Sequence, residues 1–167
     1  METLLKDKPH KRLGFASLET AEIVNKLNLV LANYQVFFHK LQNYHWNVVG
    51  SDFYDIHETT EELYKKGLTN IDNIAERVRV FGKTPIYKLS DYIKTAEIKE
   101  TSHEMSAEYM VNEVINDITI LTSFILEASE AATENGDIGT AHMMNNLILE
   151  FETYHWQLSA WNNKKFK

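Results

Sequence analysis

The sequence predicts an all-α fold, a four-helix bundle with a long, partly helical connection between its second and third helices. The chain of 167 residues has only two prolines and six glycines, which leaves few residues for the tight turns of an all-β fold. Its apolar residues also recur at alternating steps of four and three, the spacing of one helix face. We therefore expect four amphipathic helices of about 25 to 33 residues each.

The first two helices are predicted from an apolar stripe and from residues typical of helix ends. The first begins near Ser17, and its apolar stripe consists of Ile23, Leu27, Val30, Tyr34, Phe37, Leu41 and Tyr44. The second follows an N-cap at Ser51 or Asp52 and runs to Gly82, because glycine readily adopts the left-handed conformation that ends a helix. Pro85 then prevents its continuation.

The third and fourth helices are predicted from the same kinds of signal. Thr101 and Glu104 have capping-box spacing and predict the start of the third helix, which Asn135 and Gly136 close. Its stripe consists of Val111, Val114, Ile118, Leu121, Ile125, Ala128 and Ala132. Asp137 can cap the fourth helix. The stripe of that helix consists of Ala141, Met144, Ile148, Phe151, His155 and Leu158, with Trp161 near its end.

The chain divides into one domain with two short tails. We expect a basic tail at 1–16, the bundle at 17–163 and a short basic tail at 164–167. A domain of this size can bury a substantial core. The connection at 83–100 is long for a helical bundle, and Leu89–Ile93 could form a short helix within it.

The composition limits the chemistry. Because the chain has no cysteine, disulfides, thiolate nucleophiles and zinc-thiolate sites are excluded, and any metal must bind His, Asp or Glu. The net charge of -7 argues against a surface that attracts nucleic acid as a whole. No segment approaches the roughly 20 apolar residues of a membrane span, and residues 1–15 lack a signal-peptide core. A cytoplasmic protein without membrane contact is expected.

Two pairs of candidate ligands lie on the second helix. His57 and Glu61 are one turn apart, and so are Asp72 and Glu76, so each pair projects from one face. The step from His57 to Asp72 returns to within about 60° of the same face but advances about 22 Å along the axis. One metal ion therefore cannot contact both pairs in one chain.

A second copy of the helix would bring the two pairs together. If the copies pack antiparallel across a two-fold axis, the histidine end of each lies against the acidic end of its mate, which gives two equivalent intersubunit sites. His45, just before the turn into the second helix, could add an imidazole. A mixed set of imidazoles and carboxylates suits iron, zinc or manganese. Redox iron is favoured here.

Two alternatives remain open. Glu100 with His103 and Glu152 with His155 match the Glu-x-x-His spacing of a di-iron centre inside a single bundle. That centre also needs an acid from each of the other helices, and residues 23–44 contain none. A helical scaffold without metal, whose carboxylates are only surface charge, is the other alternative.

Three segments resemble the Dps family of mini-ferritins: Tyr44-His-Trp-Asn-Val48, His57-Glu-x-x-Glu61-Glu-Leu-Tyr64 and Ile71-Asp-x-Ile-Ala-Glu-Arg77. The similarity extends from about residue 20 to residue 163, including Gly136-Asp137, Thr140 and Trp156. The resemblance implies a ferritin-like four-helix bundle that forms a homo-oligomer, a hollow dodecamer. Such a shell oxidises Fe(II), preferably with hydrogen peroxide, and stores the ferric mineral, which suppresses hydroxyl-radical chemistry.

The resemblance also implies the ligand set and the role of each ligand. One subunit would contribute His45, His57 and Glu61, and its two-fold mate would contribute Asp72 and Glu76, to bind two irons per intersubunit site. Glu61 stands where many members have Asp; the charge and donor type are the same.

Other family features are expected at less distinctive residues. Trp46 could quench radicals or simply pack at the helix junction. A pore for iron could be lined by Glu130, Glu134, Asp137 and His142, the last of which stands where Asp is common in the family. DNA binding, the alternative function, would depend on basic tail residues. These are Lys6, Lys8, Lys11 and Arg12 at one end and Lys164, Lys165 and Lys167 at the other.

Overall fold

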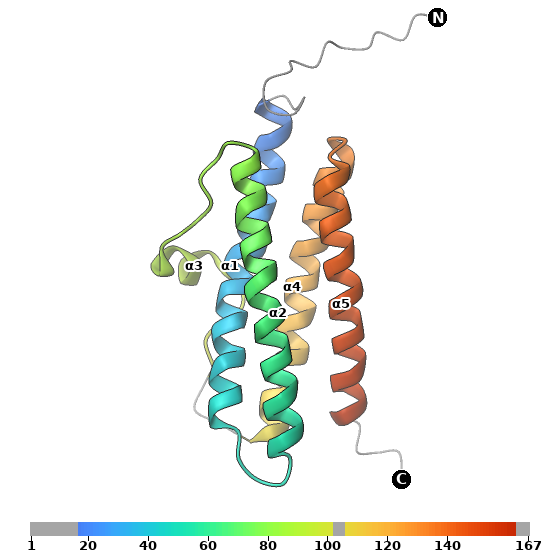
Figure 1. Ribbon diagram of the computed structural model, residues 1–167. Helices are drawn as coiled ribbons and strands as arrows, with labels where there is room; N and C mark the ends of the chain where they lie inside the picture. Colours follow the sequence, from blue (N-terminus) through green and yellow to red (C-terminus); the bar gives the residue numbers. More distant parts are fainter. Residues whose placement is uncertain (1–16, 102–105, 163–167) are drawn as a thin grey trace, which may run out of the picture.

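The computed structural model describes residues 17–101 and 106–162 (Figure 1). It contains five helices: α1 (Ser17–Asn47), α2 (Phe53–Val80), α3 (Leu89–Thr95), α4 (Ala107–Glu134) and α5 (Ile138–Asn162). No strand occurs in these residues. The predicted all-α bundle, with a short helix in its long connection, is confirmed. Among the described helices, none combines the length and apolar character needed to cross a membrane.

The four long helices form two antiparallel hairpins, α1 with α2 and α4 with α5. Helix α2 ends at the opposite end of the bundle from the start of α4, so the connection runs along the bundle beside α1 (Figure 1). A bundle with one long crossover is the arrangement found in ferritin-like folds. One face of α2 consequently stays uncovered by the rest of its own chain.

Two asparagines of α1 hold the connection in place. The Oδ1 atom of Asn33 accepts hydrogen bonds from the backbone N–H groups of Glu97 and Ile98, at 2.9 and 3.0 Å. Asn33 is fully buried. The Oδ1 atom of Asn28 accepts a bond from the N–H of Ile86 at 2.9 Å. A buried N–H needs a hydrogen-bond partner. These side chains provide one, because the described part of the connection forms no strand that would pair its backbone.

Glycines end two of the long helices as predicted. Gly82 after α2 and Gly136 after α4 have φ angles of 70° and 72°. In both, the glycine N–H bonds to the carbonyl three residues back, and the next N–H bonds to the carbonyl five residues back. This pattern satisfies carbonyls that the helix leaves free. Asp137 caps α5, because its carboxylate accepts the N–H of Thr140 at 3.1 Å.

The predicted start of the third long helix is wrong. Helix α4 begins at Ala107, and its cap is Ser106, whose hydroxyl accepts the N–H of Tyr109 at 3.2 Å. Thr101 lies 3.0 Å from the hydroxyl of Tyr44 instead. Glu104 lies outside the described residues.

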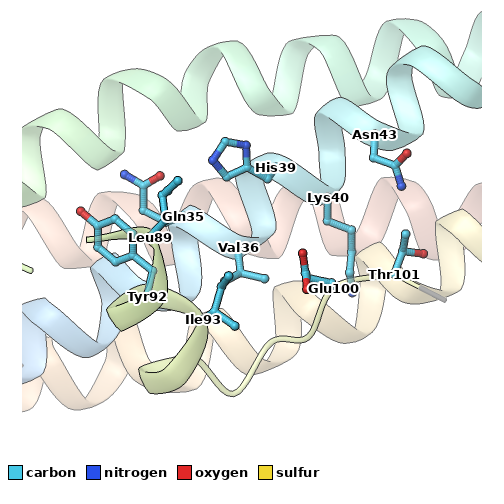
Figure 2. A pocket seen from close by; sticks show the side chains of 10 residues that line it. All are labelled: Gln35, Val36, His39, Lys40, Asn43, Leu89, Tyr92, Ile93, Glu100 and Thr101. Atoms are coloured by element: carbon cyan, nitrogen blue, oxygen red, sulfur yellow. The ribbon is translucent and has the colours of Figure 1, made fainter. Parts of the chain in front are cut away.

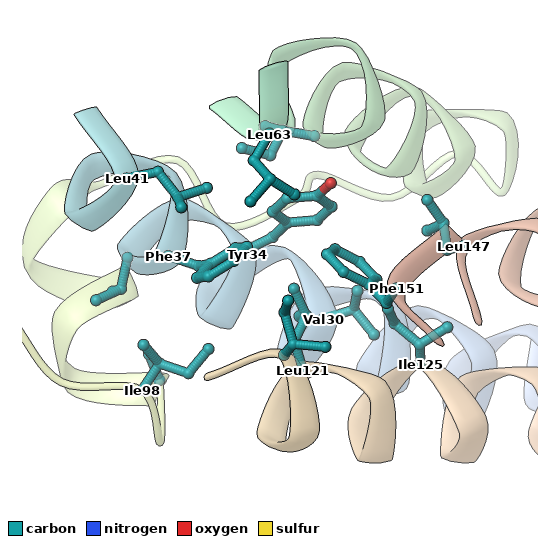
Figure 3. Packing of buried hydrophobic residues seen from close by; sticks show 14 of the residues in the cluster. Val30, Tyr34, Phe37, Leu41, Leu63, Ile98, Leu121, Ile125, Leu147 and Phe151 are labelled. Atoms are coloured by element: carbon teal, nitrogen blue, oxygen red, sulfur yellow. The ribbon is translucent and has the colours of Figure 1, made fainter. Parts of the chain in front are cut away.

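The core is a layer of apolar side chains from all four long helices (Figure 3). At its centre, Tyr34 and Phe37 of α1 meet Phe151 of α5, with ring centroids 5.5 to 6.3 Å apart. Burying each such side chain contributes about 1.5 to 3 kcal/mol. The hydroxyl of Tyr34 accepts a bond from Asn70 of α2 at 2.9 Å, so the core also fixes α2.

Candidate metal centre

Two histidines meet where α1 turns into α2. His45 is in the last turn of α1, and His57 is near the start of α2. The Nδ1 atom of His45 lies 2.9 Å from the backbone oxygen of His57. The Nδ1 atom of His57 lies 2.8 Å from the backbone oxygen of His45. The two rings stack at 3.8 Å between centroids, so each histidine fixes the other.

These reciprocal hydrogen bonds determine which ring atom is free. A carbonyl oxygen can only accept, so each Nδ1 must carry the proton and donate. In the neutral ring the lone pair then lies on Nε2, the arrangement that metal-binding histidines use. Tyr64 packs edge-on against His45 at 5.3 Å and Phe53 stacks on His57 at 4.8 Å, which restricts ring rotation.

Glu61 lies one turn after His57 on the same helix and is partly exposed. Its pKa is lowered, first by a hydrogen bond from Lys65 at 2.7 Å and then by the neighbouring charges of Lys65, His45 and His57. The carboxylate is therefore ionised at neutral pH. Glu61 therefore offers an anionic oxygen donor on the same face of α2 as His57.

Asp72 and Glu76 lie further along α2 and are exposed. Neither carboxylate has a hydrogen bond or ion pair within the part of the chain that the structure describes. Helix α2 is continuous from Phe53 to Val80, so about 22 Å of helix separates Asp72 from His57, and about 28 Å separates Glu76 from His57. Within residues 17–101 and 106–162, no three His, Asp or Glu side chains come close enough to hold a metal. Each chain thus presents two incomplete groups of ligands.

The interior of the bundle offers no di-iron site among the described residues. Lys40 of α1 and Asp117 of α4 form a buried ion pair there, at 2.6 Å. The lysine supplies the positive charge that a metal would otherwise bring. Glu152 is exposed and His155 half-buried beside a shallow pocket between α4 and α5. The other Glu-x-x-His motif includes His103, which lies outside the described residues.

The predicted pore residues divide into two kinds. Glu130, Glu134 and His142 are exposed around the turn from α4 to α5. Asp137 is only 1% exposed and pairs with Arg77 of α2 at 2.5 Å. Its charge is neutralised inside the subunit, so Asp137 adds little to any attraction of cations at this end.

Within the described part of one chain, Trp46 adds no ring contact to the site. Trp46 is 67% exposed, and its ring contacts no other aromatic ring or cation among the described residues. The tail residues predicted to contact DNA all lie outside the described ranges. These are Lys6, Lys8, Lys11 and Arg12 with Lys164, Lys165 and Lys167.

Sequence reasoning missed two residues beside the histidines. Tyr64 packs on His45, and Lys65 pairs with Glu61. The pairing of Lys65 had a visible signal, because a lysine four residues after a glutamate is a favoured helical ion pair.

The fold and the two groups of candidate ligands are typical of the ferritin-like class of helical proteins. The family described as a ferritin-like domain matches residues 24–165. The DNA protection during starvation protein of Brevibacillus brevis is 40% identical over 134 residues, covering 80% of this chain and 90% of the relative. General stress protein 20U of Bacillus subtilis is 35% identical, covering 84% and 97%.

A solved structure agrees with these relatives. The Dps protein from Vibrio cholerae O1, described as a member of a broad superfamily of ferritin-like diiron-carboxylate proteins, matches with a TM-score of 0.86 and 34% identity. The match covers 89% of this chain and 94% of that one. The chain belongs to the Dps family.

Proposed function

We propose that this protein is a ferroxidase and iron-storage subunit that oxidises Fe(II) with hydrogen peroxide at sites shared by two chains. The main support is the histidine pair, whose reciprocal bonds occupy both Nδ1 atoms and leave the Nε2 atoms free, near an ionised Glu61. The unpaired carboxylates of Asp72 and Glu76 supply the complementary group. Imidazole and carboxylate together form a donor set suited to iron.

The spacing of the proposed ligands along α2 sets the register of such a dimer. If a two-fold axis crosses α2 between residues 66 and 67, His57 lies opposite the partner's Glu76, and position 61 lies opposite position 72. Leu68 is near this axis and 61% exposed. Burying it against a second copy would stabilise the pair.

The surface beside α2 also suits a second copy. A pocket lies between α1 and α3, with α2 running alongside (Figure 2). Leu89 and Ile93 of α3 border it and are 65% and 53% exposed. Apolar side chains of this size gathered on one face are typical of an interface. A partner seated there would cover them and carry its own α2 to the histidines.

The chemistry follows from having two iron substrates at one site. Two Fe(II) ions each give one electron to one peroxide molecule, and two protons complete two waters. No one-electron product is released, because both electrons come from the same site. The carboxylates would neutralise the ferric charge. Storage of the mineral in a hollow dodecamer is part of the proposal and rests on the family.

Loss of the acidic group tests this function. Fe(II) is added without oxygen, peroxide follows, and the ferric absorbance is recorded. The double variant Asp72→Asn with Glu76→Gln should oxidise iron at least about tenfold more slowly, since each site would lose two of its three anionic ligands. Asp55→Asn with Glu58→Gln is the matched control. Oxidation at the wild-type rate in the first variant would disprove the assignment.

The control changes the same kinds of group on the same helix. Asp55 and Glu58 border a pocket formed with Gln157 and Trp161 of α5, so they lie away from the proposed dimer face. Neither variant changes an apolar side chain of α2. If only the first variant oxidises Fe(II) more slowly, the cause is loss of the site and not loss of charge from the helix.

A further inference from the structure

The carboxylate of Glu61 is already occupied by a cation of its own chain. The Lys65 ammonium lies 2.7 Å from Oε1 of Glu61, one helical turn away. Glu61 is the only acid among the ligands at the histidine end of α2. By contrast, Asp72 and Glu76 have no cation beside them among the described residues.

A metal ion and an ammonium need the same oxygen lone pairs. Lysine binds a carboxylate as a point charge on a flexible stem, and the side chain of Lys65 is 63% exposed. It can therefore withdraw into solvent without disturbing the core. An exposed helical ion pair of this kind is weak, so it would be displaced at a small but measurable cost.

We propose that Lys65 sets the metal affinity of the shared site by competing with the incoming divalent cation for Glu61. The inference rests on the proposed function, since it assumes that Glu61 is a metal ligand. Lys65 would raise the Kd of each site for a metal and make that Kd depend on the salt concentration. It is a positioning residue, because it acts through Glu61 and not on the reacting atoms.

The same helix supplies a matched control. Lys66 pairs with Glu62 at 3.0 Å with the same spacing. Its ammonium also lies 2.5 Å from the hydroxyl of Tyr154 on α5, so this pair faces the rest of the bundle. Lys66→Gln removes the same charge with no link to the proposed ligands.

Metal binding can be measured without iron oxidation. The assembled protein is titrated with Co(II), whose visible absorption reports the ligands around it. At low salt, Lys65→Gln should lower the Kd about two- to fivefold. The difference should shrink as salt rises, because salt screens the pair. Lys65→Arg and Lys66→Gln should both retain the wild-type Kd.

Two results separate failure of this inference from failure of the proposed function. If Lys65→Gln binds Co(II) no more tightly than the wild type, Lys65 does not compete and the inference is overturned. If Asp72→Asn binds Co(II) as tightly as the wild type, the shared site itself is refuted.

Discussion

Mixing two inactive variants would reveal whether each site is shared. One variant loses the histidine end through His57→Ala and Glu61→Gln, and the other loses the acidic end through Asp72→Asn and Glu76→Gln. In an antiparallel dimer of the two, one site loses both halves. The other site combines an intact histidine end with an intact acidic end.

The recovered activity follows from the two-fold geometry. Random pairing of equal amounts makes about half of the dimers mixed, and each mixed dimer has one intact site of two, so about a quarter of the wild-type sites return. A site contained in one chain would return none. The separation along α2, about 22 Å, is what forces the shared arrangement.

A second mixture checks the expected fraction of intact sites. A chain with all four substitutions is mixed with an equal amount of wild type. Shared sites then survive only in wild-type pairs, again about a quarter, whereas sites within one chain would survive in about half. The subunits are exchanged by joint refolding, and the initial rate of Fe(II) oxidation by peroxide is measured. No recovery in the first mixture, together with half in the second, would refute the shared site.

Two further predictions concern the scaffold. Asn33→Ala should lower the free energy of unfolding by about 2 to 4 kcal/mol, because one buried and one partly buried backbone N–H group lose their acceptor. Asn162→Ala, which removes an exposed bond, should change the free energy of unfolding by less than about 0.5 kcal/mol in the same urea titration. Burial raises the pKa of Asp117 to about 6. Because this value lies above that of the unfolded chain, the folded state favours the protonated acid. Relative to Asp117→Asn, the wild type should therefore lose about 3 kcal/mol of unfolding free energy as pH rises from about 4 to above 6. A pH-independent difference between these two proteins at equal concentration would contradict this account.

Most of the fold was predictable because the helices carry their own signals. The apolar stripes and the two closing glycines located four long helices, and Leu89 marked the start of the short one. The start of α4 was not predictable from local spacing. The hydroxyl of Thr101 meets Tyr44 of α1, 57 positions away in the chain, and no capping rule includes such a contact.

The positions of the candidate ligands along α2 were predictable, but the hydrogen bonds that orient the two histidines were not. Spacing placed His57 and Glu61 on one face of α2. The reciprocal bonds with His45 depend on how the turn between α1 and α2 aligns two backbone carbonyls, which residue types do not specify. Likewise, the buried pairing of Asp137 with Arg77 joins positions 60 residues apart, so its structural role could not be seen in the sequence.

Dividing the ligands between two chains has a chemical consequence under the proposed function. An isolated subunit offers iron two imidazoles and one carboxylate, and Lys65 holds that carboxylate. One weakly held Fe(II) can give peroxide only one electron, which releases a hydroxyl radical. The acids that complete a two-iron site arrive only with a second chain. The two-electron reaction, in which both electrons reach peroxide together, would therefore occur only in the assembled protein.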